Sequence, residues 1–129
     1  MPRQYDLSLI TAPRVEGTVT VRDGRKLGFA EFGPAGGRAV VWLHGTPGAR
    51  RQIPQAARLA AVDLDVRLLG LDRPGVGFST PHLYESILDF TTDFEIVLDQ
   101  LGIDDLAVIG LSGGGPYALA AAAALPDRV

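Results

Sequence analysis

Three short apolar runs, each followed at once by a glycine-rich joint, constrain the fold of this 129-residue chain more than any other feature. The runs are residues 39–43, 66–71 and 106–109. A continuous apolar run of this length is typical of a strand that is covered on both faces. Segments with helical character, residues 54–62 and 87–101, separate the runs. This alternation of strand and helix favours right-handed crossovers and a mostly parallel sheet.

An antiparallel pair of strands is predicted ahead of this alternating part. Residues 18–22 alternate in β-branched side chains, and residues 26–32 form a second strand-like run. The Asp-Gly dipeptide between them is a strong hairpin signal. Residues 1–16 show no clear period and are interpreted as an N-terminal arm, and residues 17–129 as a single partial α/β domain.

Composition excludes several classes of function. The formal net charge of −3 and the scattered arginines argue against nucleic-acid binding. The absence of cysteine excludes disulfides, thiolate metal sites and a cysteine nucleophile. The most apolar stretch, residues 118–125, is shorter than the roughly 20 residues that a membrane helix needs. A cytoplasmic protein with no metal, no cofactor and no membrane partner is therefore expected.

The third joint, residues 110–114, fits the pattern G-x-S-x-G between a strand and a helix. Ser112 on such a tight turn would be held in a strained backbone conformation, at the positive end of the helix dipole. Its neighbours Gly110 and Gly114 would approach closely, so that only glycine avoids a Cβ clash. The alternative is an ordinary turn in which Ser112 is the N-cap of the last helix.

The first joint strengthens the interpretation of Ser112 as a nucleophile. Acyl transfer needs N–H donors aimed at the oxyanion, one after the nucleophile and one from an earlier strand–helix loop. Gly113 would supply the first donor. The loop His44–Gly48 lies in the right place for the second, with Thr46 as the natural donor. The alternative is a plain turn with one structural histidine.

Together the three joints resemble the α/β-hydrolase superfamily. Its members begin with a hairpin and carry H-G-x-P-G, D-R-x-G-x-G-x-S and G-x-S-x-G after successive strands. Here these motifs are His44–Gly48, Asp72–Ser79 and residues 110–114, and the resemblance runs from about residue 18 to residue 129. It implies the N-terminal part of an α/β-hydrolase fold: an antiparallel hairpin, then a mostly parallel sheet flanked by helices, in strand order 1-2-4-3-5.

The resemblance also implies a role for seven residues: Ser112 as the nucleophile, Gly113 and Thr46 as backbone N–H donors to the oxyanion, Gly110 and Gly114 as the glycines of the elbow, and His44 and Gly45 as residues that shape the oxyanion loop. The segment Asp72–Ser79 is architectural by the same resemblance. A serine at the elbow, where other branches have an aspartate, argues against dehalogenase and epoxide-hydrolase chemistry.

Members of the superfamily supply a catalytic acid and then a histidine after later strands. In this sequence both histidines precede Ser112, and the chain ends at Val129. His82 is interpreted as a solvent-facing loop residue, since a base must lie within about 3 Å of the serine oxygen and be oriented by a third group. The expectation is a truncated serine hydrolase that acts on an ester, amide or related acyl substrate through an acyl-enzyme at Ser112 and is inactive alone.

Two other functions remain open. The chain could be a non-catalytic, half-length protein that associates with itself or with a complementing chain through an open sheet edge at residues 106–110. Dinucleotide binding is also formally possible, because Gly113–Ala118 fits G-x-G-x-x-A after a strand. Against it, Pro116 removes an N–H from the turn that would cradle pyrophosphate.

Overall fold

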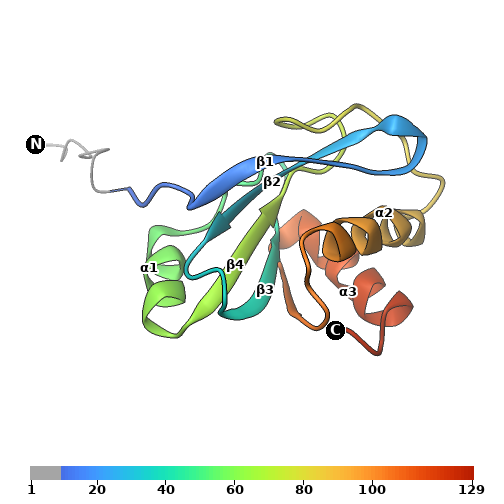
Figure 1. Ribbon diagram of the computed structural model, residues 1–129. Helices are drawn as coiled ribbons and strands as arrows, with labels where there is room; N and C mark the ends of the chain where they lie inside the picture. The colour runs from blue at the N-terminus through green and yellow to red at the C-terminus, as the bar shows by residue number, and fades with distance from the viewer. Residues whose placement is uncertain (1–9) are drawn as a thin grey trace, which may run out of the picture.

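The computed structural model describes residues 10–129. In chain order its elements are β1 (Val15–Thr20), the 3₁₀ turn η2 (Arg22–Gly24), β2 (Lys26–Phe32), β3 (Arg38–Leu43), α1 (Gln55–Asp63), β4 (Val66–Leu71), α2 (Ile87–Gln100), β5 (Ala107–Gly110), the 3₁₀ turn η3 (Ser112–Gly114) and α3 (Gly115–Ala124). The five strands form one sheet in the order β1-β2-β4-β3-β5, which confirms the predicted order (Figure 1). Strand β2 is antiparallel to β1 and β4, whereas β3 is parallel to β4 and β5.

The N-terminal hairpin forms where the Asp-Gly dipeptide predicts it. Asp23 and Gly24 have φ angles of +60° and +70°, in the left-handed region that aspartate tolerates and glycine adopts freely. Strand β1 begins at Val15, so Val15 and Glu16 belong to the sheet and not to the predicted arm. The alternation of β-branched residues begins only at Thr18 and gave no sign of this earlier start. Residues 1–9 of the arm lie outside the described residues.

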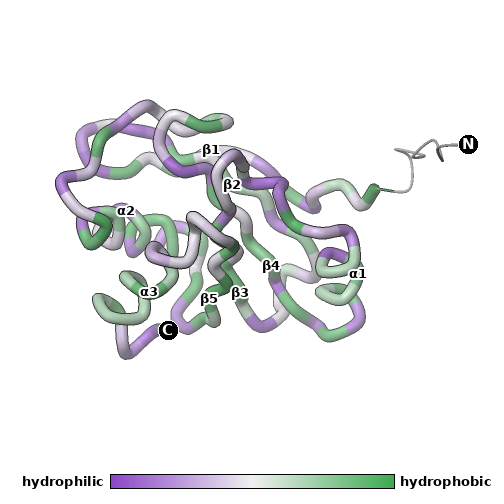
Figure 2. Tube along the Cα trace, turned by 180° about the vertical axis from the view of Figure 1, so that it is seen from behind, coloured by the Kyte–Doolittle hydropathy of each residue, from purple (hydrophilic) through white to green (hydrophobic). Residues whose placement is uncertain are grey.

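The apolar core has two parts, one on each face of the sheet. The larger lies under α2 and α3, and α2 contributes four buried side chains to it: Phe90, Phe94, Val97 and Leu98. The smaller lies under α1, where Ala61 packs with Phe32 and Leu68. Figure 2 shows hydrophobic residues along β3 and β5. The sheet is therefore covered on both faces, and its strand ends carry the loops that form the candidate site.

Strand β5 is less buried than its apolar sequence predicts. Ala107 and Ile109 are exposed, Ile109 to 42%, while Val108 and Gly110 are only half-buried. Among the described residues β5 lies at the edge of the sheet and pairs only with β3. Val108 reaches the core under α3, whereas Ile109 lies on the α1 face, at the border of a hollow that α1 leaves open. The prediction of a strand buried on both faces was wrong here. An apolar run indicates a strand, but burial depends on what packs beside it.

Candidate active site

The turn between β5 and α3 holds Ser112 in a backbone conformation that few residues adopt. Its φ angle is +47°, in the left-handed region, which costs a non-glycine residue about 1–3 kcal/mol. Ser112 is exposed, and in the described part of the chain its side chain makes no hydrogen bond and caps neither η3 nor α3. The structure therefore does not support the interpretation of Ser112 as an ordinary helix N-cap.

Two glycines allow this turn to close against the sheet. A Cβ atom at Gly110 would lie 2.6 Å from the Cα of Gly115, and one at Gly114 would lie 2.0 Å from the carbonyl oxygen of Leu43. Both contacts are with backbone, which cannot rotate away as a flexible side chain could. Any larger residue at either position would displace the turn, and Ser112 with it.

The loop after β3 lies directly against this elbow. The N–H of Leu111 donates to the carbonyl oxygen of Leu43 at 3.0 Å. A Cβ atom at Gly113 would lie 3.0 Å from Thr46 Oγ1 and 3.6 Å from the backbone nitrogen of Thr46. Among the described residues, no acceptor takes the N–H of Thr46 or that of Gly113. The two N–H groups predicted to bind an oxyanion thus lie in neighbouring backbone segments, and both lack a protein partner.

His44 is buried within this loop, with 2% of its surface exposed. Its Nδ1 lies 2.7 Å from the carbonyl oxygen of Gly45, and its Nε2 lies 3.2 Å from the backbone nitrogen of Arg73. The second contact makes Nε2 the acceptor, so the proton of the neutral ring is assigned to Nδ1. Burial, aided by the charge of Arg73, lowers the pKa of His44. Both ring nitrogens are therefore used within the loop, and neither can serve Ser112 as a base.

The lowered pKa of His44 predicts a loss of stability in mild acid. The unfolded chain binds a proton at His44 below about pH 6.5, whereas the folded chain resists protonation until a lower pH. The free energy of unfolding should therefore fall between about pH 7 and pH 5.5, by at most about 1.4 kcal/mol per pH unit. Urea titrations at several pH values measure this. His44→Asn should flatten the dependence in that range.

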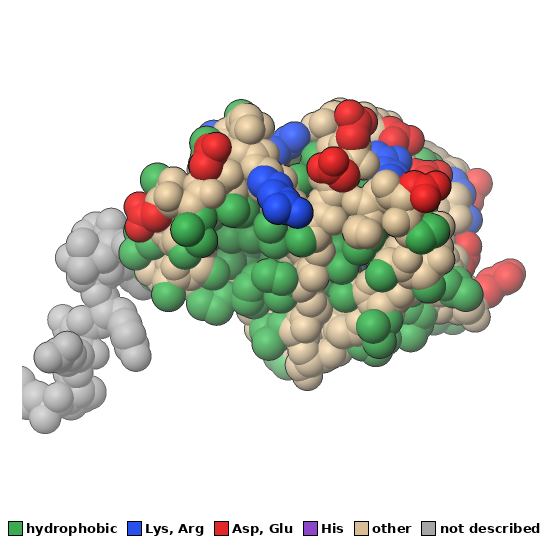
Figure 3. Space-filling model, turned by 90° about the horizontal axis from the view of Figure 1, so that it is seen from below, with side chains coloured by type: hydrophobic (Ala, Val, Ile, Leu, Met, Phe, Trp, Pro, Cys, Tyr) green, Lys and Arg blue, Asp and Glu red, His purple; other side chains and the backbone are tan. Residues whose placement is uncertain are grey.

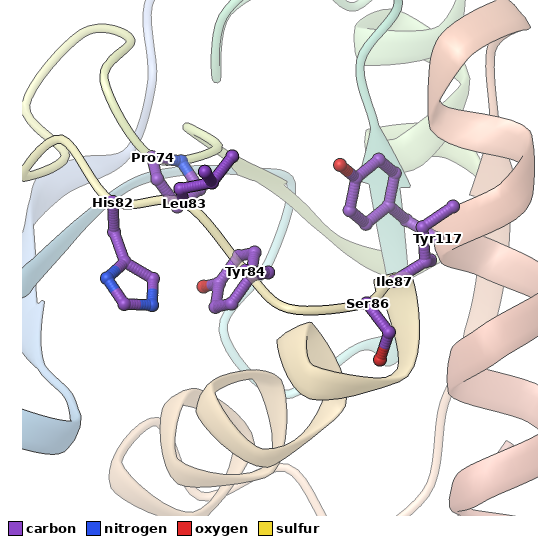
Figure 4. Close-up of a pocket in the computed structure, with 7 residues that line it drawn as sticks. All are labelled: Pro74, His82, Leu83, Tyr84, Ser86, Ile87 and Tyr117. Carbon is purple, nitrogen blue, oxygen red and sulfur yellow. The ribbon is translucent and has the colours of Figure 1, made fainter.

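His82 lies on the connection between β4 and α2 and is exposed, as predicted. Its ring meets the ring of Tyr84 edge-on, with 4.9 Å between the centroids. Figure 4 shows it at one side of a hollow of ≈ 260 Å³, across from Tyr117 of α3. In residues 10–129 no hydrogen bond joins His82 to Ser112. The structure therefore gives Ser112 no histidine partner from this segment.

The loop after β4 is organised around Asp72, which is fully buried. Its carboxylate accepts hydrogen bonds from the backbone N–H of Arg50 at 2.7 Å, from Arg50 Nη1 at 3.0 Å and from the N–H of Phe78 at 2.9 Å. Ser79 Oγ donates to the carbonyl oxygen of Asp72 at 2.6 Å and accepts from the N–H of Gly28 at 2.9 Å. These contacts join β2, the loop after β3 and the loop after β4, which is an architectural arrangement.

Two side chains to which no sequence pattern assigned an individual role hold the loop after β3. Arg73 is buried and donates to the carbonyl oxygens of His44 and Gly45. Gln52 accepts from the N–H of Gly45 at 3.0 Å and donates to the carbonyl oxygen of Pro47 at 3.1 Å. In the sequence, Arg73 stands beside Asp72, which suggests an ion pair between them. Gln52 lies in a polar loop, where no periodic pattern marks it. The partners of both side chains are therefore visible only in the folded structure.

Residues 10–129 show neither a metal-binding cluster nor a candidate membrane span. They contain no group of three or more histidine, aspartate or glutamate side chains arranged to hold a metal ion. None of the helices in this part of the chain has the length and apolar character of a membrane span.

The chain is similar in sequence to known proteins. A family model described as alpha/beta hydrolase fold matches residues 38–129. Over 120 residues the chain is 34% identical to a proline iminopeptidase of Arabidopsis thaliana, covering 91% of this chain and 31% of that protein. A proline iminopeptidase of Xanthomonas citri is also 34% identical, over 86% of this chain and 36% of that protein. The chain spans about a third of the length of the curated relatives that it matches.

A solved structure adds a likeness in fold. The chain superposes on a thermophilic esterase from Thermogutta terrifontis with a TM-score of 0.73 and 27% identity. The match covers 88% of this chain and 42% of the esterase chain. Thus sequence and structure both relate these residues to one part of larger proteins.

Proposed function

The chain belongs to the alpha/beta hydrolase fold family, and on that premise we propose that Ser112 is the nucleophile of a hydrolase acting on an ester, amide or related acyl compound. Ser112 Oγ would attack the acyl carbon, and the carbonyl oxygen would become an oxyanion facing the N–H groups of Thr46 and Gly113. The serine proton would pass to a base and then to the leaving group. Water would later cleave the acyl-enzyme.

One observation carries this proposal: an exposed serine at φ +47°, beside two backbone N–H groups for which the described residues offer no acceptor. Donors held in place before the reaction stabilise an oxyanion without reorganising. The relatives named proline iminopeptidase support a carbonyl substrate. A serine nucleophile, unlike a carboxylate, is also the usual choice for acyl transfer.

The described residues give Ser112 no base. Both nitrogens of His44 are engaged, and His82 makes no contact with the serine. Oxyanion donors and binding alone retain about 10³–10⁴-fold catalysis over water in serine proteases that lack triad members. We therefore expect residues 10–129 by themselves to react slowly at Ser112, but selectively.

Fluorophosphonate labelling followed by peptide mass spectrometry tests the proposal. Ser86 is the internal control, because it is also an exposed serine at a helix start, where it caps α2. We expect Ser112 to be labelled at least about 10²-fold faster than Ser86, since Ser112 alone has oxyanion donors beside it. Ser112→Ala should abolish the fast labelling. Equal rates at Ser112 and Ser86 in the unmodified chain would contradict the proposal.

A second candidate function, association through the sheet edge, is favoured by the exposure of β5. In the described part of the chain only β3 pairs with this strand. Ile109 borders an apolar hollow of ≈ 190 Å³, which is lined by Val40 and Trp42 of β3 and by residues of α1. Figure 3 shows apolar side chains gathered across the underside of the molecule. Open apolar edges of this kind recruit further strands.

If the edge mediates association, the sedimentation coefficient should rise with protein concentration. Ile109→Lys places a charge on β5 and should shift the chain toward the monomer. Leu119→Lys is the matched control, because Leu119 is 74% exposed and belongs to α3 and not to the open strand, so its replacement should leave association unchanged. A compact monomer at all concentrations would exclude this function.

A further inference from the structure

Arg73 is a buried arginine without an acidic partner among the described residues. It lies against the loop after β3 and against α3, the helix that follows Ser112. Arg73 is 8% exposed, and within residues 10–129 no carboxylate lies within ion-pair distance of it. The neighbouring carboxylate of Asp72 pairs with Arg50 instead. Burial lowers the pKa of Arg73. Because taking a guanidinium out of water is costly, its remaining contacts must compensate.

All side-chain hydrogen bonds of Arg73 go to the oxyanion loop. Nη1 donates to the carbonyl oxygen of His44, and Nη2 donates to the carbonyl oxygen of Gly45 at 3.4 Å and to Thr46 Oγ1 at 3.2 Å. The guanidinium carbon also lies 4.8 Å from the ring centroid of Tyr117, which is part of α3. One side chain therefore contacts both the loop after β3 and the helix that follows the elbow.

The carbonyl of Gly45 is the important acceptor, because it belongs to the same peptide group as the N–H of Thr46. It lies 2.7 Å from Nδ1 of His44, in addition to its contact with Arg73. In a trans peptide the C=O and N–H bonds point in opposite directions. Holding the carbonyl toward the interior therefore directs the Thr46 N–H outward. A cation on the carbonyl also polarises the peptide and strengthens its N–H as a donor.

Building on the proposed function, we propose that Arg73 is a positioning residue that fixes the Gly45–Thr46 peptide so that the N–H of Thr46 faces the oxyanion formed at Ser112. The contact with Tyr117 holds the guanidinium at a fixed position relative to α3. Arg73 acts through the loop and does not itself touch the reacting atoms.

Arg58 is a matched control for the loss of a buried arginine. It is 7% exposed, makes no ion pair among the described residues, and lies over the ring of Phe32 at 4.5 Å. It also donates to three backbone carbonyls, those of Thr11, Arg51 and Ile53. None of these residues belongs to the segment from His44 to Thr46. A purely structural effect should therefore be shared by both arginines, whereas an effect on the Thr46 peptide should be limited to Arg73.

The test compares Arg73→Met, Arg73→Lys and Arg58→Met in the full chain. The first readout is the amide resonance of Thr46 in ¹H–¹⁵N spectra, which needs no reaction at Ser112. The second is the rate of fluorophosphonate labelling at Ser112. Arg73→Met should move the Thr46 resonance and slow labelling about tenfold or more. Arg73→Lys keeps the positive charge and can still donate to one carbonyl group. It should therefore recover part of the Thr46 resonance position and part of the labelling rate. Arg58→Met should lower the melting temperature but leave both readouts unchanged.

A Thr46 resonance at its original position in Arg73→Met would overturn the proposal, and so would an equal displacement in Arg58→Met. If Arg73→Met fails to fold, the same two criteria apply to Arg73→Lys. Failure of the proposed function would look different: Ser112 would react no faster than Ser86 in the unmodified chain, while the Thr46 resonance still depended on Arg73.

Discussion

Asp72→Asn should lower the free energy of unfolding by about 3–5 kcal/mol, a large share of the total. The carboxylate of Asp72 is fully buried and faces donors at both oxygens: Oδ1 accepts from the N–H of Arg50, and Oδ2 from Arg50 Nη1 and the N–H of Phe78. An asparagine has one oxygen, so its NH₂ group must face a donor in either orientation. Removing one partner of a buried ion pair costs about 3–5 kcal/mol. A domain of this kind has only about 5–15 kcal/mol in total.

Urea unfolding followed by circular dichroism measures this loss. Asp63→Asn is the matched control, because Asp63 is exposed at the end of α1 and makes no ion pair in the described part of the chain. Its replacement should change the free energy of unfolding by less than about 0.5 kcal/mol. A midpoint for Asp72→Asn equal to that of Asp63→Asn would mean that the buried carboxylate does not organise the loop after β4.

Gly114→Ala and Gly115→Ala should have opposite effects although the two residues are adjacent. The new methyl group at Gly114 would lie 2.0 Å from the carbonyl oxygen of Leu43, whereas at Gly115 it would meet nothing within 4 Å. Gly115 also has helical angles, φ −57° and ψ −50°, which alanine adopts without strain. We expect Gly114→Ala to cost about 3 kcal/mol, the upper end of the usual cost of overpacking, and to displace the elbow. Gly115→Ala should gain about 0.4–1 kcal/mol, because it reduces the entropy of the unfolded chain.

Thermal melting of the two variants, together with labelling of Ser112, checks this pair. Gly115→Ala should label at the rate of the unmodified chain, whereas Gly114→Ala should lose fast labelling even where it remains folded. If both variants melt above the unmodified chain, the elbow does not approach the carbonyl of Leu43 as closely as the structure indicates.

The features that could be predicted from sequence are those with a local steric cause. The Asp-Gly dipeptide gave the hairpin because two consecutive residues with positive φ restrict the choice of side chain. Gly110 and Gly114 could be assigned to the elbow for the same kind of reason, and the structure places backbone atoms where their Cβ atoms would be. The strand order came from the family resemblance carried by these motifs, not from the periodicity of the strands.

Features that depend on distant neighbours were predicted only where the family resemblance supplied them. The apolar run from Leu106 to Ile109 suggested a buried strand, whereas the resemblance suggested the open sheet edge that β5 forms among the described residues. Arg73 stands next to Asp72 in the sequence, yet it binds the carbonyl groups of another loop while Arg50 takes the carboxylate. Asp72 and Arg73 are adjacent in the sequence but bind different groups, and no local sequence pattern indicates which groups these are.

The sheet order has a consequence for synthesis on the ribosome. The hairpin β1–β2 can pair as soon as its residues emerge, because its strands are adjacent in the sequence. Strand β3 cannot join the hairpin, since β2 pairs with β4 on its other side. Its apolar residues 39–43 must therefore wait for residues 66–71, which takes a few seconds at roughly 5–20 residues per second. The interval during which the nascent chain exposes an unpaired apolar strand is set by topology and translation speed, not by composition.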